Sequence, residues 1–289
     1  MKKVHSFYEP YLKYLSDTRM SDKTITEHRR FLYGAIDKTV GDKWLFSLRI
    51  NDAALVGKEA EKNGKYGTQR ALVVYRRLLR FIHREGYKMS FYWKDVEVPY
   101  MAPIPVEYLD TQELQQLREA IPLNDRLHAG LRTRTIIELI IATGLRISEV
   151  CSLDISDINW GNKEMKVLNC KSDKVQTVYL TDESLRWIRM YLDSRTDKMP
   201  FLFVSGRGRL LPASAKGYLH SIKQKIGLNK RIYHHLLRKT FITHLVRNTD
   251  IKTAQKLARH EDPKTTLNHY TATDNMREKS EHLRIMKNL

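Results

Sequence analysis

The sequence predicts a mainly α-helical fold with one small β-sheet, divided into a helical N-terminal domain and a second domain of the α+β class. Apolar residues recur at helical spacing through most of the chain, residues 163–180 alternate as two paired strands do, and three prolines stand together in residues 99–105. The chain has 289 residues, of which 42% are hydrophobic. It is therefore long enough to form two domains that each enclose an apolar core.

The first part of the chain, residues 1–98, is predicted to be a helical domain. Ser21 or Asp22 is expected to cap a helix that runs to about Ile36. A second helix is expected to start at a Thr68 cap and to end at residue 85, where Gly86 provides a left-handed stop.

This second helix is expected to have two different faces. One is an apolar stripe made by Leu72, Tyr75, Leu79 and Ile82. The other carries a basic residue at every fourth position, namely Arg76, Arg80 and Arg84. We interpret the basic face as a surface that contacts phosphates.

Residues 99–109 are predicted to be an extended linker, because prolines interrupt helices and favour extended backbone. The second domain is then expected to span residues 110–289. A helix signal begins at Thr111, and the β-hairpin is expected at 163–180 with its turn at 171–174. Asp154 and Asp157 are interpreted as caps or solvated charges. Further helices are expected at residues 133–142, from 147, and at 182–192, 213–226, 235–248, 251–259 and 274–286.

The charge of the chain indicates a polyanionic partner. Lys and Arg outnumber Asp and Glu by 51 to 33, which gives a net charge of +18, and the excess is shared between both predicted domains. Such a field attracts nucleic acid.

Other features of composition predict a cytoplasmic protein. Cys151 and Cys170 are too few for a disulfide framework and are expected to be reduced thiols. No apolar segment follows the basic N-terminus, so a signal peptide is not expected. The most apolar stretch, residues 136–145, is short and contains Glu138, which predicts a buried helix and no membrane contact.

Four segments of the second domain carry residues suited to phosphate chemistry. Arg146 follows Gly144 at a predicted helix start, where a guanidinium can contact a phosphate, and Glu149 could orient it. The other segments hold a lysine in the hairpin turn, a His-x-x-Arg pair on one helix face, and a late histidine followed by a tyrosine. In order, these residues are Lys171, His235, Arg238, His260 and Tyr270.

These segments, in this order, resemble the catalytic domain of the tyrosine recombinase (phage integrase) family over residues 106–280. The first box is Ala-Thr-Gly-Leu-Arg-Ile-Ser-Glu-Val at residues 142–150, and the His-x-x-Arg box is His-Leu-Leu-Arg at residues 235–238. The resemblance implies that residues 1–98 form the helical core-binding domain. It also implies six active-site residues: Arg146, Lys171, His235, Arg238, His260 and Tyr270.

The resemblance implies DNA strand exchange by transesterification. Arg146, Arg238 and His260 would stabilise the charge on the phosphate, and Tyr270 would be the nucleophile. His235 would act as a base or hydrogen-bonding group, and Lys171 would protonate the leaving 5′ oxygen. No metal or other cofactor is expected, because the five histidines of residues 234–269 lack a metal-binding spacing.

Three residues depart from the family pattern. Lys239 stands where histidine is commoner, Cys170 where glycine is frequent, and Arg259 replaces the usual glycine before the late histidine. Arg259 either changes the local turn or adds a phosphate contact, and Lys174 is an alternative to Lys171 as the catalytic lysine. The residues expected to contact DNA are Arg76, Arg80, Arg84, Lys174 and Arg259.

The expected partner is double-stranded DNA with a short inverted-repeat core site, bound by a homotetramer at synapsis and by a monomer or dimer otherwise. The segment 274–289 is expected to dock on a neighbouring protomer. Dimer resolution, transposon resolution and integration or excision all stay open, as does the need for an accessory protein. Two alternative functions are a type IB topoisomerase and a sequence-specific DNA-binding protein without catalysis.

Overall fold

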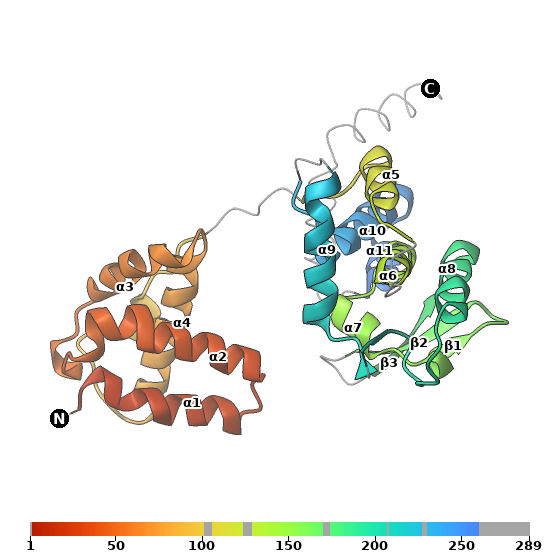
Figure 1. Cartoon of the computed structure of the whole chain (residues 1–289). Helices are drawn as coiled ribbons and strands as arrows, with labels where there is room; N and C mark the ends of the chain where they lie inside the picture. Colours follow the sequence, from red (N-terminus) through yellow and green to blue (C-terminus); the bar gives the residue numbers. More distant parts are fainter. Residues whose placement is uncertain are drawn as a thin grey trace, which may run out of the picture. The chain divides into compact units, whose positions relative to one another are not determined.

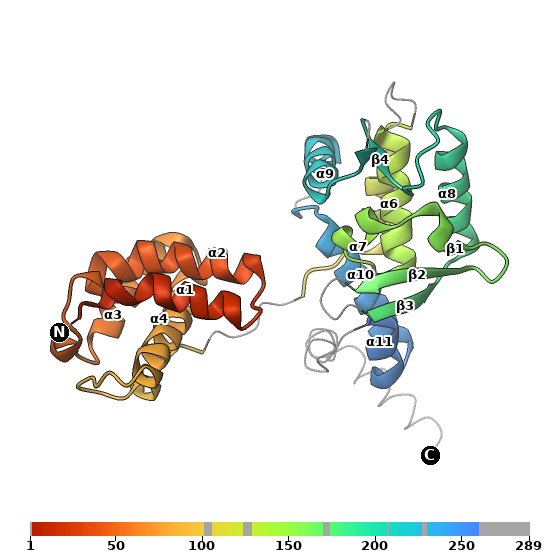
Figure 2. The same ribbon diagram turned by 90° about the horizontal axis from the view of Figure 1, so that it is seen from below.

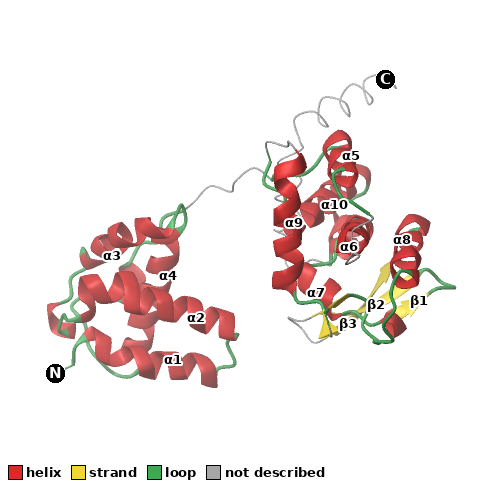
Figure 3. Ribbon diagram, in the orientation of Figure 1, coloured by secondary structure: helices red, strands yellow, loops and turns green. Residues whose placement is uncertain are grey.

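The computed structural model describes residues 2–100, 106–123, 129–169, 174–206, 208–226 and 230–259. The chain divides into two compact units, Met1–Pro103 and Ile104–Leu289 (Figure 1). The fold is mainly helical, as the sequence predicts, and its described residues form two small sheets where the sequence predicts one (Figure 3). Cys170, the turn of the hairpin and the segment 274–289 lie outside the described residues.

The first unit is built from helices around one apolar core. Its longer elements are α1 (Tyr8–Asp17), α2 (Asp22–Phe31), the π-helix η2 (Leu32–Gly41), α3 (Asp52–Ala60) and α4 (Gly67–Arg84). Short 3₁₀ turns join or flank them: η1 (Val4–Phe7), η3 (Leu45–Ser47), η4 (Glu61–Asn63) and η5 (Trp93–Asp95). Tyr8, Tyr11 and Tyr75 are fully buried at the centre of this core.

The structure decides how the first predicted helix begins and ends. Ser21 is the cap, because its hydroxyl accepts a hydrogen bond from the backbone N–H of Thr24 at 3.3 Å. The α-helix ends at Phe31 and continues as a π-helix to Gly41, with a non-helical Gly34 inside. The predicted end at Ile36 is therefore wrong, and the reason is a change of helix type that apolar spacing does not reveal.

α4 begins at Gly67, so the prediction of a Thr68 cap is wrong. A Cβ on residue 67 would stand 2.0 Å from the carbonyl oxygen of Ala60, so a glycine is required where α3 and α4 meet. The Thr68 hydroxyl instead donates to the carbonyl of Gly57 at 2.9 Å. The predicted apolar stripe of α4 is buried, and Gly86 has a φ of 84°.

The second unit places seven α-helices and two small sheets among its described residues. The sheets are antiparallel: β1 (Ile158–Asn159), β2 (Glu164–Asn169) and β3 (Lys174–Tyr179) form one, and β4 (Val204–Ser205) and β5 (Gly208–Arg209) form the other. The helices are α5 (Thr111–Glu119), α6 (Ala129–Thr143), α7 (Ile147–Ser152), α8 (Asp182–Asp193), α9 (Pro212–Ile226), α10 (His234–Asn248) and α11 (Ile251–Ala258). Among the described residues, the predicted strands of the hairpin and the helices predicted up to residue 259 are confirmed to within a few residues, whereas the helix predicted at 274–286 lies outside them.

Helix α6 lies at the centre of this unit, with α9 and α8 on opposite sides (Figure 2). Ile136, Ile137, Leu139 and Ile140 are buried in its core. The prediction of a buried helix here is confirmed.

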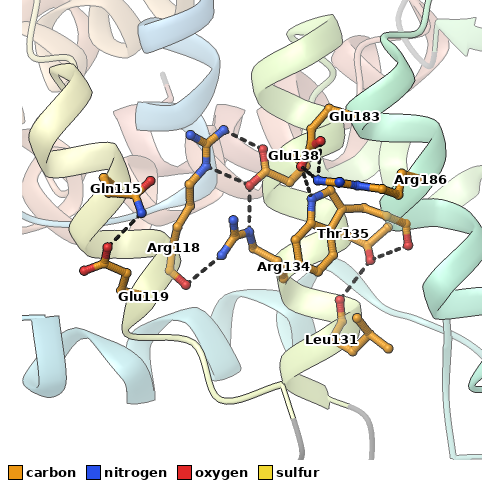
Figure 4. Close-up of polar contacts among 10 residues, drawn as sticks. Gln115, Arg118, Glu119, Leu131, Arg134, Thr135, Glu138, Glu183 and Arg186 are labelled. Carbon is orange, nitrogen blue, oxygen red and sulfur yellow. Dashed lines mark hydrogen bonds and ion pairs between the residues drawn. The ribbon is translucent and has the colours of Figure 1, made fainter.

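Glu138 is the charged residue of this buried segment, and it is paired. Its carboxylate accepts two hydrogen bonds from Arg118 of α5, at 2.8 and 2.7 Å, and one from Arg134 at 2.6 Å (Figure 4). Because a buried carboxylate without partners is strongly destabilising, these arginines explain why glutamate is tolerated in an apolar helix.

Caps define the ends of several elements. Asp110 and Glu113 form a reciprocal capping box at the start of α5. Asp154 and Asp157 form a similar box on the short 3₁₀ turn η6 (Ile155–Asp157). Of the two interpretations offered by the sequence, caps or solvated charges, the structure shows caps. Asp154 also accepts a hydrogen bond from Arg209 at 2.7 Å.

Candidate active site

The first box of the sequence forms a sharp turn between α6 and α7. Gly144 has a φ of 65°, and a Cβ there would stand 2.3 Å from the Phe241 ring, so this position requires glycine. Leu145 is fully buried and anchors the turn in the core. Arg146 follows in extended conformation as the residue before α7, with 32% of its side chain exposed.

Glu149, one turn into α7, holds Arg146 in place. Its Oε1 accepts a hydrogen bond from Nη1 of Arg146, and its Oε2 accepts one from the Arg146 backbone N–H, both at 2.8 Å. The side chain of Glu149 is only 2% exposed. The expectation that Glu149 orients Arg146 agrees with this geometry.

Arg238 of α10 is fully buried beneath the same turn. Its Nη2 donates to the carbonyl of Ala258, at the end of α11, at 2.6 Å, and its Nη1 donates to the carbonyl of Gly144. Arg238 therefore ties the α6–α7 turn to the end of α11.

Arg259 reaches the same carboxylate from the end of α11. Its Nη2 donates to Oε2 of Glu149 at 2.8 Å, and its side chain is 5% exposed. Its Nε and Nη1 are buried without a partner among the residues that the structure describes. The sequence predicts a turn residue or a DNA contact at Arg259 but not the ion pair, because the partner of Arg259 is 110 residues away.

The described part of the site contains three guanidinium groups and one carboxylate. Burial, together with the positive charges of Arg146 and Arg259, lowers the pKa of Arg238 to about 9, although Glu149 opposes the shift. Arg238 is thus charged at neutral pH, but its charge is poorly compensated. An anion placed beside these arginines would supply the missing negative charge.

Two histidines start α10, and their environments differ. His235 keeps part of its side chain exposed to solvent. Burial of the rest, together with the charges of Lys239, Arg238 and Arg146, lowers its pKa. His235 is therefore neutral at pH 7 and able to accept a proton. His234 is buried, and its burial beside Lys216 lowers its pKa to about 4.

Three of the predicted active-site residues, Lys171, His260 and Tyr270, lie outside the described residues. Their assignments stay predictions. Lys174, the alternative lysine, is exposed at the start of β3, where it pairs with Asn169 of β2.

The arginines predicted to contact DNA from the first unit lie on α4 beside aromatic rings. Arg76 and Arg80 stand over the ring of Trp93, at 5.8 and 5.3 Å, and Arg84 stands over Tyr14 at 5.4 Å. Nη1 of Arg84 also donates to the Tyr14 hydroxyl at 2.8 Å. These contacts orient the guanidinium groups while Arg80 and Arg84 remain exposed.

Within the described ranges, no three His, Cys, Asp or Glu side chains gather in a way that could hold a metal ion. Among the same residues, no helix is both long and apolar enough to cross a membrane.

Comparison with known proteins identifies the family. Residues 107–277 match the profile of the phage integrase family, and this match covers more than half of the chain. The chain belongs to the phage integrase family. Among curated members, it is 28% identical to tyrosine recombinase XerC of Alcanivorax borkumensis, over 87% of this chain and 84% of that protein. It is 33% identical to tyrosine recombinase XerA of Pyrococcus furiosus, over 63% of each chain.

Two solved integrase structures share the fold. The Tn1549 transposon integrase, in complex with transposon right end DNA, aligns with a TM-score of 0.80 at 18% identity, over 99% of this chain and 100% of that one. A lambda integrase tetramer bound to a Holliday junction aligns with a TM-score of 0.74 at 18% identity, over 91% of this chain and 79% of that one.

Proposed function

We propose that this phage integrase family member is a site-specific DNA recombinase that cuts and rejoins strands through a 3′-phosphotyrosyl intermediate. One observation carries the proposal: at the α6–α7 turn Glu149 pairs with Arg146 and Arg259, while Arg238 beneath the turn donates only to the backbone carbonyls of Gly144 and Ala258, so the described part of the site has more positive than negative charge. Such an excess of positive charge suits a phosphodiester, whose negative charge grows in the transition state. The names of the relatives support the same activity.

The reaction assigns a role to each predicted residue, and His260 acts with Arg146 and Arg238 on the charge of the phosphate. Tyr270 attacks the phosphorus, His235 or a neighbouring group takes the phenolic proton, and the 3′ phosphate becomes esterified to the tyrosine. Lys171 protonates the departing 5′ oxygen, so a free 5′ hydroxyl forms. Because the ester preserves the energy of the broken bond, rejoining to another 5′ hydroxyl needs no ATP. Arginines stabilise the charge, and the proposed reaction has no step that requires a metal or other cofactor.

Covalent trapping tests the nucleophile. Wild-type protein, Tyr270→Phe and the matched control Tyr179→Phe, whose tyrosine is exposed on β3, are incubated with nicked duplexes from the DNA that flanks the gene. EDTA is present, and the mixtures are then denatured in SDS. We expect adducts with wild type and Tyr179→Phe, and none with Tyr270→Phe.

The outcomes of the trapping experiment separate the alternatives. An adduct with Tyr270→Phe would place the nucleophile elsewhere. Specific binding by wild type without an adduct would favour a DNA-binding protein without catalysis. If an adduct forms and supercoiled DNA is relaxed, but strands of two sites are never exchanged, the protein is a type IB topoisomerase.

The proposed substrate is double-stranded DNA with an inverted-repeat core site, and the proposed assembly is a homotetramer at synapsis, within the cytoplasm. The lambda integrase relative is a tetramer on a Holliday junction. Resolution of dimers, resolution of transposons, and integration or excision all remain compatible with this activity.

Removal of the C-terminal segment tests the assembly. We expect a variant that lacks residues 276–289 to form the Tyr270 adduct on a single site but to lose synapsis and strand exchange, because residues 274–289 are proposed to dock on a neighbour. Gel-shift assays with two labelled sites measure synapsis. Intact recombination by the shortened chain would contradict this role of the segment.

A further inference from the structure

Arg259 occupies a backbone conformation that is unfavourable for its side chain. It follows the last residue of α11 with φ 55° and ψ 44°, in the left-handed region that favours glycine. For a residue with a Cβ this conformation costs about 1 kcal/mol or more. Glycine would end the helix without this cost, so ending α11 does not by itself account for an arginine.

The side chain of Arg259 is buried rather than directed to solvent. It is 5% exposed, and its Nη2 lies 2.8 Å from Oε2 of Glu149, which is 2% exposed. Removing two charges from water is expensive, and truncation of one member of a buried pair leaves the other uncompensated. Glu149 therefore offsets part of the cost of burying Arg259.

Glu149 connects Arg259 to the first arginine of the site. Oε2 of Glu149 receives both the Arg259 guanidinium and the backbone N–H of Arg146, while Oε1 receives Nη1 of Arg146. Arg146 is the more exposed guanidinium, at 32%. The end of α11 thus fixes the carboxylate that orients the exposed arginine.

We propose that Arg259 is a positioning residue for strand cleavage, whose guanidinium holds Glu149 so that Glu149 holds Arg146 against the scissile phosphate. This inference rests on the proposed recombinase function. It assigns Arg259 an action through Glu149 instead of a separate DNA contact.

The groups that face Glu149 predict a pH signature. They are Arg146 on its own turn, Arg259 from α11 and Arg238 from α10. Burial alone would raise the pKa of Glu149, but Arg259, followed by the hydrogen bonds from Arg146, keeps that pKa below its usual value. Without Arg259, Glu149 would become protonated at a higher pH and release Arg146.

The test measures single-turnover cleavage and DNA binding separately across pH. The variants are Arg259→Gly, which suits the left-handed backbone, Arg259→Lys, which restores a positive charge, and Lys252→Ala, an exposed cation of α11 that serves as control. Arg259→Gly should bind DNA with unchanged affinity but cleave roughly tenfold or more slowly at saturating protein, because small displacements of a catalytic group have large effects on rate. As the pH is lowered, the cleavage rate of Arg259→Gly should begin to fall at a higher pH than that of wild type. Arg259→Lys should recover part of the rate and part of the pH shift.

A second comparison shows whether Arg259 acts through Glu149. In the background of Glu149→Gln, Arg259→Gly should cause little additional loss and no further pH shift, since coupled residues are not additive. Additive losses would overturn the proposal. Weaker DNA binding with an unchanged saturating rate would also overturn it and would make Arg259 a direct contact.

Two controls keep the result interpretable. The melting temperature of each variant shows whether it is folded. If Arg259→Gly is unfolded, the cleavage rate of Arg259→Lys and its pH dependence test the proposal instead. A wild-type rate in Arg259→Gly overturns the positioning role alone. Absence of a Tyr270 adduct in wild type overturns the recombinase function itself.

Discussion

Glu149 organises the described part of the site, although its own negative charge would repel a phosphate. It joins Arg146, which is three residues before it in sequence, to Arg259, which is 110 residues away. The first contact follows from a spacing of three residues and was expected from the sequence. The second could not be predicted, because nothing local to either residue reports a distant partner. The assignments of Lys171, His260 and Tyr270 stay predictions, since these residues lie outside the described ranges.

Arg146→Ala tests the cation cluster at the scale of one residue. We expect the rate of adduct formation to fall by roughly 10²–10³-fold, because one donor to the developing negative charge is lost. Arg146→Lys should recover only part of this rate, since ammonium cannot make the bidentate contact of a guanidinium. The rate is measured under single-turnover conditions with a nicked duplex.

The matched control for Arg146→Ala is Arg189→Ala. This substitution removes an exposed arginine of α8 whose guanidinium stands over the Trp160 ring. It changes the net charge equally and should leave the rate within about twofold, since surface substitutions have small effects. A near-wild-type rate for Arg146→Ala would remove this residue from the site.

Single elements were predictable to different degrees. Strong amphipathic patterns located α4 and α8 well, and the alternation of residues 163–180 located β2 and β3. The errors occurred where tertiary contacts decide the boundary. Gly67 begins α4 because α3 packs tightly against it, and the π-helix after Phe31 follows from no simple period.

The β2–β3 hairpin carries two candidate general acids, Lys171 and Lys174. A DNA substrate with sulfur in place of the bridging 5′ oxygen distinguishes them, because a thiolate leaves readily without a proton. We expect Lys171→Ala to cleave ordinary DNA poorly and the sulfur substrate at a nearly normal rate. Lys174→Ala should behave as wild type on both.

The same assay has two contradicting outcomes. If the sulfur substrate rescues Lys174→Ala instead, then Lys174 is the acid. If neither alanine variant slows cleavage of ordinary DNA, the hairpin does not supply the proton. Arg146→Ala provides the comparison, since sulfur substitution should not rescue the loss of a charge-stabilising group.

At the scale of the whole molecule, the fold class and the family were predictable, because hydrophobic periodicity and the order of the motifs extend over long stretches. Buried polar groups were not, because their burial depends on how helices pack. His28 is one example: it is 3% exposed in the first unit, where its Nδ1 lies 3.0 Å from the Tyr11 hydroxyl. His234 is the corresponding buried histidine of the second unit.

These two histidines predict that the protein loses stability in acid. Burial lowers the pKa of each to about 4, with smaller contributions from Arg77 and Lys216, against an ordinary value of 6.5. Between pH 6.5 and 4 the unfolded chain binds protons that the folded protein does not, so the free energy of unfolding is greatest above pH 6.5 and falls as the pH is lowered. Each histidine contributes on the order of 3 kcal/mol at most.

Urea unfolding at pH 7.5 and pH 5 measures this effect. We expect His28→Gln to reduce the difference between the two pH values, whereas His83→Gln, which alters an exposed histidine of α4, should leave it unchanged. Equal stability of the wild-type protein at both pH values would contradict the assignment of buried neutral histidines.

The two hydrogen bonds of Arg238 have a consequence for the order of biosynthesis. They join the carbonyl of Gly144 to that of Ala258, so the guanidinium is held by segments that leave the ribosome at different times. A nascent chain that has not yet emerged as far as α11 lacks one of the two anchors, and Glu149 lacks Arg259. The protein therefore acquires its cation cluster late in translation, and an unfinished chain carries no assembled centre with which to cut DNA.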